Sequence, residues 1–408
     1  TSLPLTLWTM LALQLLFLGL AAGLVRWQRL PLLVPAAPIA RDPKRWLVLG
    51  LGVLLTLSIL KLVLAGSVLT LQVPTFFDDA RDNWNLRAKV IVETQHIPVQ
   101  MPGEDGAGGG VASYPSTLPL LKAWLVSLAG GWSEALVNSV QSLWLVIAGL
   151  LVGGAVGRRR GSAWGLAAVT ALLGLPLLGI HALHSYGDLM VAAFATATIL
   201  AFFEADRAES REGFFAWLGL GIAAVALLPA LKNEGLAVFF PSGLLLLGWV
   251  LWRSLRRGDS ERSDALRALM GAGIAVAVTT LPWLVFKWAQ GLTFGNAHAI
   301  GETGFGWQTG VLGAISYHLF SEGNWLLLPG LALVLLALRR RLAFGPLLVL
   351  TLSCFWIFAA LSGLFLISTD LGHEALKQTG YGRAMVQVSV AWTLLVFLLL
   401  PDPRDEAA

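Results

Sequence analysis

The sequence predicts an all-α integral membrane protein. Of its 408 residues, 56% are hydrophobic and only 13% are charged, and the mean hydropathy is +0.74. Soluble domains carry about 25% charged residues, so this chain has too few polar groups to cover a surface in water. The 17 Trp and 44 Gly agree with a bilayer location, because Trp favours the headgroup region and Gly is frequent in membrane helices. The composition excludes a soluble fold, and we expect no nucleic-acid partner.

Eleven apolar runs are long enough to be transmembrane helices. A helix needs about 20 mostly apolar residues to cross the hydrocarbon layer, and continuous rather than alternating apolar residues argue against a barrel. The predicted spans lie near residues 4–25, 47–70, 134–155, 163–183, 187–204, 213–231, 235–252, 268–287, 323–338, 343–367 and 384–400. No small-residue cleavage pattern follows the first, which we expect to be a retained helix. Together they predict a single transmembrane domain over residues 1–408.

Basic residues predict the orientation of this bundle. Lys and Arg concentrate in the cytoplasmic loops of membrane proteins. One set of alternate loops holds most of them, including Arg158–Arg160, Arg253, Arg256, Arg257 and Arg339–Arg341. We therefore expect the amino terminus outside and the carboxyl terminus in the cytoplasm. The two long polar loops, 71–133 and 288–322, then both face outward, and any chemistry is expected there.

The first long loop opens with three acids, Asp78, Asp79 and Asp82, directly after a span. Two interpretations stay open. The apolar residues between and after these acids, which include Trp84, are compatible with an amphipathic helix in the membrane interface, with Trp84 at the headgroups. Alternatively, the segment is a solvated loop whose acids pair with the basic residues Arg81, Arg87 and Lys89.

The remainder of this loop has two recognisable segments. Gly103–Gly110 is rich in glycine and is expected to form a mobile hairpin or lid. Tyr114 and Pro115 then precede Ser116, Thr117 and Pro119. Prolines that bracket a Ser-Thr pair can start a helix, so we expect this segment to turn the chain back into the membrane.

Asp188 begins the fifth span, and an acid at the membrane edge is costly unless it is paired or hydrated. It either holds a cation together with Asp78 or Asp79, or caps the helix that follows. The nearby His181 and His184 are expected to be interfacial hydrogen-bonding groups, since no His-Glu-x-x-His spacing accompanies them.

Two later outer turns carry cations. Lys232 and Glu234 lie between two spans, where they pair with each other or leave Lys232 as a fixed cation facing an outer vestibule. Arg383 stands at the threshold of the last span, after His373 and Glu374. Its guanidinium either snorkels to lipid headgroups or binds one particular phosphate, whose oxygens match its planar fork.

These motifs resemble the GT-C superfamily, the multi-span glycosyltransferases that use polyprenyl-phosphate-linked sugars. The resemblance rests on Asp78 and Asp79 followed by Trp84, Arg87 and Lys89, on Tyr114-Pro115 with Pro119, and on Asp188, Lys232-Asn233-Glu234-Gly235 and Gly382-Arg383. It covers residues 47 to about 395. It implies a GT-C-like bundle with interfacial helices in the first outer loop, in a bacterial inner membrane with the active site on the periplasmic face.

The resemblance also implies an activity. A sugar would move, with inversion, from a polyprenyl-phosphate donor to a glycan, lipid or protein acceptor. Asp79 would be the general base and Asp78 would position the acceptor or a cation. Arg383 and Lys232 would bind the donor phosphate. Supporting roles would fall to Asp188, Glu234, Trp84, Tyr114 and His373.

A metal requirement stays open at this point. The two acids are adjacent rather than spaced as Asp-x-Asp, which differs from the family pattern. A divalent cation, Mg or Mn, would take its ligands from Asp78, Asp79 and Asp188.

Two other classes of protein remain as alternatives. A secondary transporter would carry its coupling acids near the bilayer midplane on broken helices, whereas the acids here gather at one edge. A ligase or polymerase of surface glycans would also use outer-face charges. The sidedness of the acids therefore favours the transferase over the transporter.

Overall fold

The computed structural model describes residues 45–401 apart from residues 78, 102–110, 259–261 and 294–303, together with scattered positions between residues 6 and 19. Most of the predicted span 4–25, Asp78 and the Gly103–Gly110 segment lie outside the described residues. Within the described residues the chain is helical and has no strand, and one isolated bridge joins Phe305 to Ser368. The prediction of an all-α protein is confirmed.

The helices follow one another with short connections. Their bounds are α2 Arg45–Leu71, η1 Asp79–Asn85, α3 Leu86–Thr94, α4 Thr117–Ala129, α5 Glu134–Arg160, α6 Ser162–Gly174, α7 Pro176–Leu183, α8 Asp188–Asp206, α9 Arg211–Leu227, η2 Leu228–Ala230, η3 Gly235–Phe239, α10 Phe240–Arg257, α11 Arg262–Thr279, α12 Leu281–Ala289, α13 Val311–Phe320, α14 Leu328–Leu338, α15 Arg340–Ala343, α16 Leu348–Ile367, α17 Thr369–Leu376 and α18 Gly380–Leu399.

Every predicted span from residue 47 onward coincides with one or two of these helices, but the expected number of eleven is not confirmed. In the described part of the chain, seven helices are long and apolar enough to cross a membrane, or nine if two bent pairs each count as one span. The pair α6 and α7 bends by 74° beside Pro176, which has no N–H to continue the hydrogen-bond ladder. The helix α14, within the predicted span 323–338, has only 11 residues.

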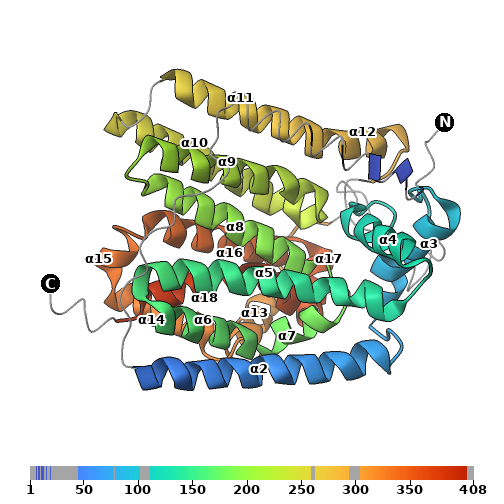
Figure 1. The fold of residues 1–408 in the computed structure, drawn as a ribbon, viewed down its shortest axis with the longest axis horizontal. Helices are drawn as coiled ribbons and strands as arrows, with labels where there is room; N and C mark the ends of the chain where they lie inside the picture. The colour runs from blue at the N-terminus through green and yellow to red at the C-terminus, as the bar shows by residue number, and fades with distance from the viewer. Residues whose placement is uncertain are drawn as a thin grey trace.

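The most buried helices, α8 and α18, lie at the centre of the bundle (Figure 1). Helices α5, α9 and α16 pack around them, whereas α2 lies along one side and α11 with α12 along the other. None of the apolar window of α2 is buried, as is usual for a helix that faces lipid. The chain is a multi-pass membrane protein in which two helices, both entering from the same end, form the core.

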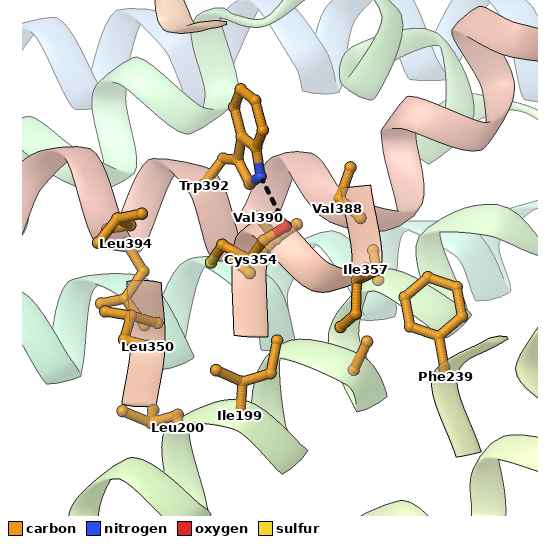
Figure 2. Packing of buried hydrophobic residues seen from close by; sticks show 14 of the residues in the cluster. Ile199, Leu200, Phe239, Leu350, Cys354, Ile357, Val388, Val390, Trp392 and Leu394 are labelled. Atoms are coloured by element: carbon orange, nitrogen blue, oxygen red, sulfur yellow. Dashed lines mark hydrogen bonds between the residues drawn. The ribbon is translucent and has the colours of Figure 1, made fainter. Parts of the chain in front are cut away.

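Side chains from α8, α16 and α18 interlock inside this core. Figure 2 shows Ile199, Cys354 and Trp392 at the contact, where the Trp392 indole donates to the Cys354 carbonyl at 3.5 Å. The Cys354 thiol is buried. Because close-packed interiors have low compressibility, this contact holds α8, α16 and α18 in fixed positions relative to one another.

The two ends of the bundle differ in chemistry. At the end that holds α15, buried carboxylates are paired with arginines: Asp206 with Arg253 at 2.7 Å, and Asp264 with Arg211 at 2.6 Å. We name this the basic end. At the opposite end lie α3, α4 and α17 and the first residues of α8 and α18 (Figure 1). We name this the site end, since the residues with candidate chemistry gather there.

Candidate active site

The first outer loop folds into helices that pack on the bundle. Asp79–Asn85 forms one stretch of π-helix that continues into α3. Trp84 is 1% exposed, and its ring lies 5.5 Å from that of Tyr114. A Cβ at Gly187 would come within 3.1 Å of this indole, so glycine at that position allows the close approach. The expectation that Trp84 lies at the headgroups is wrong, because the bundle buries it.

Two buried cations hold the Tyr114-Pro115 turn. Arg87 donates to the Tyr114 carbonyl at 2.6 Å and to the Ser116 hydroxyl at 2.9 Å. Lys287, far along the chain, donates to the Ser113 carbonyl at 2.8 Å. The helix α4 then starts at Thr117, as the prolines predict. Arg87 therefore positions the turn through backbone and hydroxyl oxygens.

Asp188 lies between Lys232 and Arg383, and it is contacted by more side chains of the candidate site than either of them. It is fully buried, and its Oδ1 accepts from Lys232 Nζ at 2.7 Å and from Gln387 Nε2 at 2.7 Å. Its other oxygen lies 3.7 Å from His181 Nδ1 and 3.8 Å from Arg383 Nη2. Neither interpretation from the sequence describes this arrangement, since α8 has no side-chain cap and the carboxylate is paired with Lys232.

Lys232 is enclosed between two carboxylates. Besides Asp188 it contacts Glu234 at 3.0 Å, so both pairings are present at once. Burial alone would lower the pKa of Lys232, but the negative charges of Asp188 and Glu234 outweigh it and hold the pKa above its usual value. Gly235 closes the turn, because a Cβ there would collide with the Leu228 carbonyl oxygen.

Arg383 is the more accessible cation. It forms an ion pair with Asp79, and its guanidinium lies 4.6 Å from the centre of the Tyr186 ring. Its side chain is 28% exposed and that of Asp79 is 38% exposed, whereas that of Lys232 is only 5% exposed. A ligand entering from the site end would therefore meet Arg383 and Asp79 first, with Lys232 behind them.

Of two other predicted site residues, Tyr114 borders the charged cluster and His373 does not. Burial raises the pKa of the Tyr114 phenol, and the charge of Glu234 adds to the effect, so this hydroxyl borders the cluster as a neutral group. His373 is exposed on α17, and no contact of its side chain joins it to the cluster among the residues that the structure describes. The structure thus brings together Asp79, Asp188, Lys232, Glu234, Tyr114 and Arg383, with Trp84 supporting them from behind.

The described residues do not form a metal site. No group of three or more His, Cys, Asp or Glu side chains is arranged to hold a metal ion in this part of the chain. Asp188 uses one oxygen for Lys232 and Gln387, and Asp79 is paired with Arg383. These oxygens are therefore already engaged by cationic or amide donors, and Asp78 lies outside the described residues.

Three residues of the site were not assigned from the sequence. Gln387 and His181 surround Asp188, and Tyr186 lies under Arg383. Gln387 lies four residues after Arg383 in an otherwise apolar span, which places both side chains on one helix face. A polar side chain in such a span requires a buried partner, and that signal could have identified it.

An apolar cavity of about 180 Å³ opens between α8, α10 and α16. Leu228 and Phe239 line it, and they flank the turn that carries Lys232 and Glu234. Trp249 and Trp356 lie on its exposed rim. The cavity therefore begins beside the charged cluster and continues along the apolar part of the bundle.

No protein-family model matches the chain, and no curated protein matches its sequence. Among solved structures, it is similar to ArnT from Cupriavidus metallidurans bound to undecaprenyl phosphate, with a TM-score of 0.58 and 16% identity over 86% of this chain. The apo structure of the same protein matches 88% of this chain with a TM-score of 0.60 and 16% identity.

The chain spans 61% of the length of ArnT in both comparisons. These matches confirm the predicted helical membrane bundle at the level of fold. An identity of 16% carries the fold and not the substrates. The protein therefore has an ArnT-like fold.

Proposed function

We propose that this protein is a membrane glycosyltransferase that moves a sugar from a polyprenyl-phosphate donor to an acceptor on the outer face of the membrane. The observation that carries the proposal is the convergence of Asp79, Asp188, Lys232 and Arg383 at one end of an ArnT-type bundle. ArnT binds undecaprenyl phosphate, and this cluster has the groups that such a ligand needs.

The accessible cation supports a role in phosphate binding. The guanidinium of Arg383 is partly exposed and its planar fork matches phosphate oxygens. In transfer from a lipid phosphate, negative charge develops on the departing phosphate, and a fixed cation stabilises it. Lys232, held behind by two carboxylates, keeps Asp188 in place.

Asp79 is the proposed general base. As the acceptor oxygen bonds to the anomeric carbon, the bond from that carbon to the phosphate oxygen breaks and its electron pair leaves with the phosphate. The acceptor proton passes to the Asp79 carboxylate, which contributes about 10²- to 10⁴-fold to the rate. A single displacement of this kind inverts the sugar carbon. A donor phosphate that engages Arg383 would also release Asp79 from its ion pair.

The cavity between α8, α10 and α16 supports a lipid-linked donor. An isoprenoid chain is apolar and long, and a lipid-linked substrate needs a groove that opens sideways to the bilayer. The cavity starts next to Lys232 and has exposed tryptophans on its rim, which supports its use by the first isoprene units. The charged groups gather where helices begin rather than at their middles, which does not favour the transporter.

The decisive experiment uses the purified protein and a panel of undecaprenyl-phosphate-linked hexoses and pentoses. We expect release of undecaprenyl phosphate with at least one donor, and the melting temperature should rise with that donor. A protein that releases no lipid phosphate and is stabilised by no donor would contradict the proposal. Uptake of a solute into vesicles without sugar transfer would support the transporter instead.

A further inference from the structure

Glu374, on α17, packs against the start of α18. A Cβ at Gly380 would collide with Glu374 Oε2, so the carboxylate lies directly over the first residue of that helix. The connecting turn holds it there. Gln378 has a positive φ of 60°, and Thr379 donates to the Glu374 carbonyl from its N–H at 3.0 Å and from its hydroxyl at 3.2 Å.

The charged groups around Glu374 are those of the candidate active site. Burial raises the pKa of Glu374, and Arg383, Lys232, Asp79 and Glu234 are the charged groups that influence it. Asp79 and Asp188 are paired with cations, whereas the Glu374 carboxylate has no hydrogen bond or ion pair to any residue in the described ranges. Both of its oxygens are available to accept hydrogen bonds.

The depth of Glu374 matches the position of a sugar. Helix α18 runs from Gly380 inward, and Arg383 lies three residues further in, about 4.5 Å along the axis. The apolar cavity lies deeper still on α8, since its first lining residue there, Ala195, is seven residues, or about 10 Å, beyond Asp188. If the lipid tail occupies the cavity and the phosphate contacts Arg383, the sugar lies at the level of Glu374.

We propose that Glu374 recognises the transferred sugar by accepting hydrogen bonds from its hydroxyl groups. The inference rests on the proposed function and adds a residue that determines which sugar is bound. A carboxylate offers two acceptor oxygens, which suit neighbouring hydroxyls, and hydrogen bonds to a charged acceptor are stronger than neutral ones. Neither Arg383 nor Lys232 supplies an acceptor, so this contact is chemically distinct from phosphate binding.

The test compares E374Q with the unchanged protein in detergent, using undecaprenyl phosphate and undecaprenyl-phosphate-linked sugars as ligands. We expect E374Q to bind undecaprenyl phosphate as the unchanged protein does, but to bind the preferred sugar-linked donor about 10- to 100-fold more weakly, with KM rising more than kcat falls. D370N is the matched control, because Asp370 lies one turn earlier on the same helix and is exposed like Glu374, and it should behave as the unchanged protein.

Three results would overturn the inference. In the first, E374Q keeps its full preference for the sugar-linked donor over undecaprenyl phosphate. In the second, E374Q loses affinity for undecaprenyl phosphate as much as for the sugar-linked donor. E374D, which keeps the charge on a shorter side chain, would bind donors as poorly as E374Q while melting at the same temperature. If no lipid phosphate stabilises the unchanged protein, the proposed function fails and the inference fails with it.

Discussion

At the scale of single residues, the candidate site contains two cations in different surroundings. Arg383 has Asp79 as its ion-pair partner and is partly exposed, while Lys232 is buried between Asp188 and Glu234. The two cations therefore have different tasks. We expect an incoming phosphate to replace Asp79 at Arg383, whereas removing Lys232 would leave the buried Asp188 carboxylate without its closest cation.

D79N should abolish most sugar transfer and tighten the binding of undecaprenyl phosphate. The amide cannot accept the acceptor proton, so the rate should fall about 10²- to 10⁴-fold. Arg383 no longer has to leave an ion pair, so the phosphate should bind several-fold more tightly, by roughly the value of one partly exposed pair. Turnover and ligand-induced melting shifts measure both effects.

D82N is the control for this prediction, because Asp82 pairs with Arg81 at 2.5 Å on the neighbouring surface. It should leave turnover and binding unchanged. Weaker binding of undecaprenyl phosphate by D79N would show that Asp79 does not restrain Arg383.

K232M should destabilise the protein strongly. Removing one member of a buried ion pair leaves the other charge without compensation, which typically costs about 3–5 kcal/mol. K89M, at an exposed position on α3, is the control and should leave the melting temperature nearly unchanged. The double variant K232M/D188N should recover part of the loss, because it removes both charges. Equal melting temperatures for K232M and K89M would contradict the burial of this pair.

His184 should make stability depend on pH between about 6.5 and 4. Burial lowers the pKa of His184 to about 4, below the usual 6.5. The contribution of this neutral histidine is fully present above pH 6.5 and is lost as the pH falls toward 4, because the unfolded chain takes up the proton first. Melting temperatures of H184Q should therefore decline less steeply in this window than those of H96Q, which replaces an exposed histidine. Parallel curves would refute the assignment.

At the scale of elements, short turns place the charged residues. The turn from η2 to η3 carries Lys232 and Glu234, and it closes only because Gly235 has no Cβ near the Leu228 carbonyl oxygen. The turn from α17 to α18 sets Glu374 over Gly380 in the same way. In both turns, glycine is required because a Cβ would collide with a neighbouring oxygen: the Leu228 carbonyl at Gly235 and the Glu374 carboxylate at Gly380.

G235A should lower both the melting temperature and sugar transfer. The new Cβ must push the Leu228 carbonyl away, which displaces Lys232 from Asp188 and distorts the end of the cavity. We expect a loss of about 1–3 kcal/mol in stability. G248A, in the adjoining helix α10 where a Cβ meets open space, is the matched control and should change neither property. Thermal unfolding with a transfer assay distinguishes the two variants.

At the scale of the whole molecule, the bundle separates a basic end from a site end. The arginines that sequence patterning assigns to the cytoplasm meet at the basic end, and Asp79 and Arg383 lie at the other. The positive-inside tendency therefore predicts that the site end faces outside the cell.

Cysteine labelling of intact cells tests this orientation. D370C, on α17 at the site end, should react with a membrane-impermeant maleimide from outside. R340C, on α15 at the basic end, should react only after permeabilisation. The native Cys354 is buried and should give little background. Labelling of R340C alone in intact cells would reverse the orientation and remove the periplasmic assignment of the site.

Much of the fold and most residues of the candidate site could be predicted from the sequence. The apolar runs from residue 47 onward coincide with helices, and Asp79, Asp188, Lys232 and Arg383 were identified by their place at span ends. The ion pairs that these residues form could not be predicted. The burial of Trp84 and the hydrogen bond from Gln387 to Asp188 could not be predicted either. Gln387 is neither charged nor part of a motif, and its contact with Asp188 forms only in the folded protein.

The sequence alone determined that this is a membrane bundle, where its helices run and which edge carries the acids, because hydropathy and charge are properties of each local segment. Tertiary structure alone decided which cation meets which carboxylate. Lys232 and Asp188 are 44 residues apart, and Arg383 and Asp79 are 304 apart. Contacts over such separations depend on how whole helices pack, and no local pattern encodes that packing.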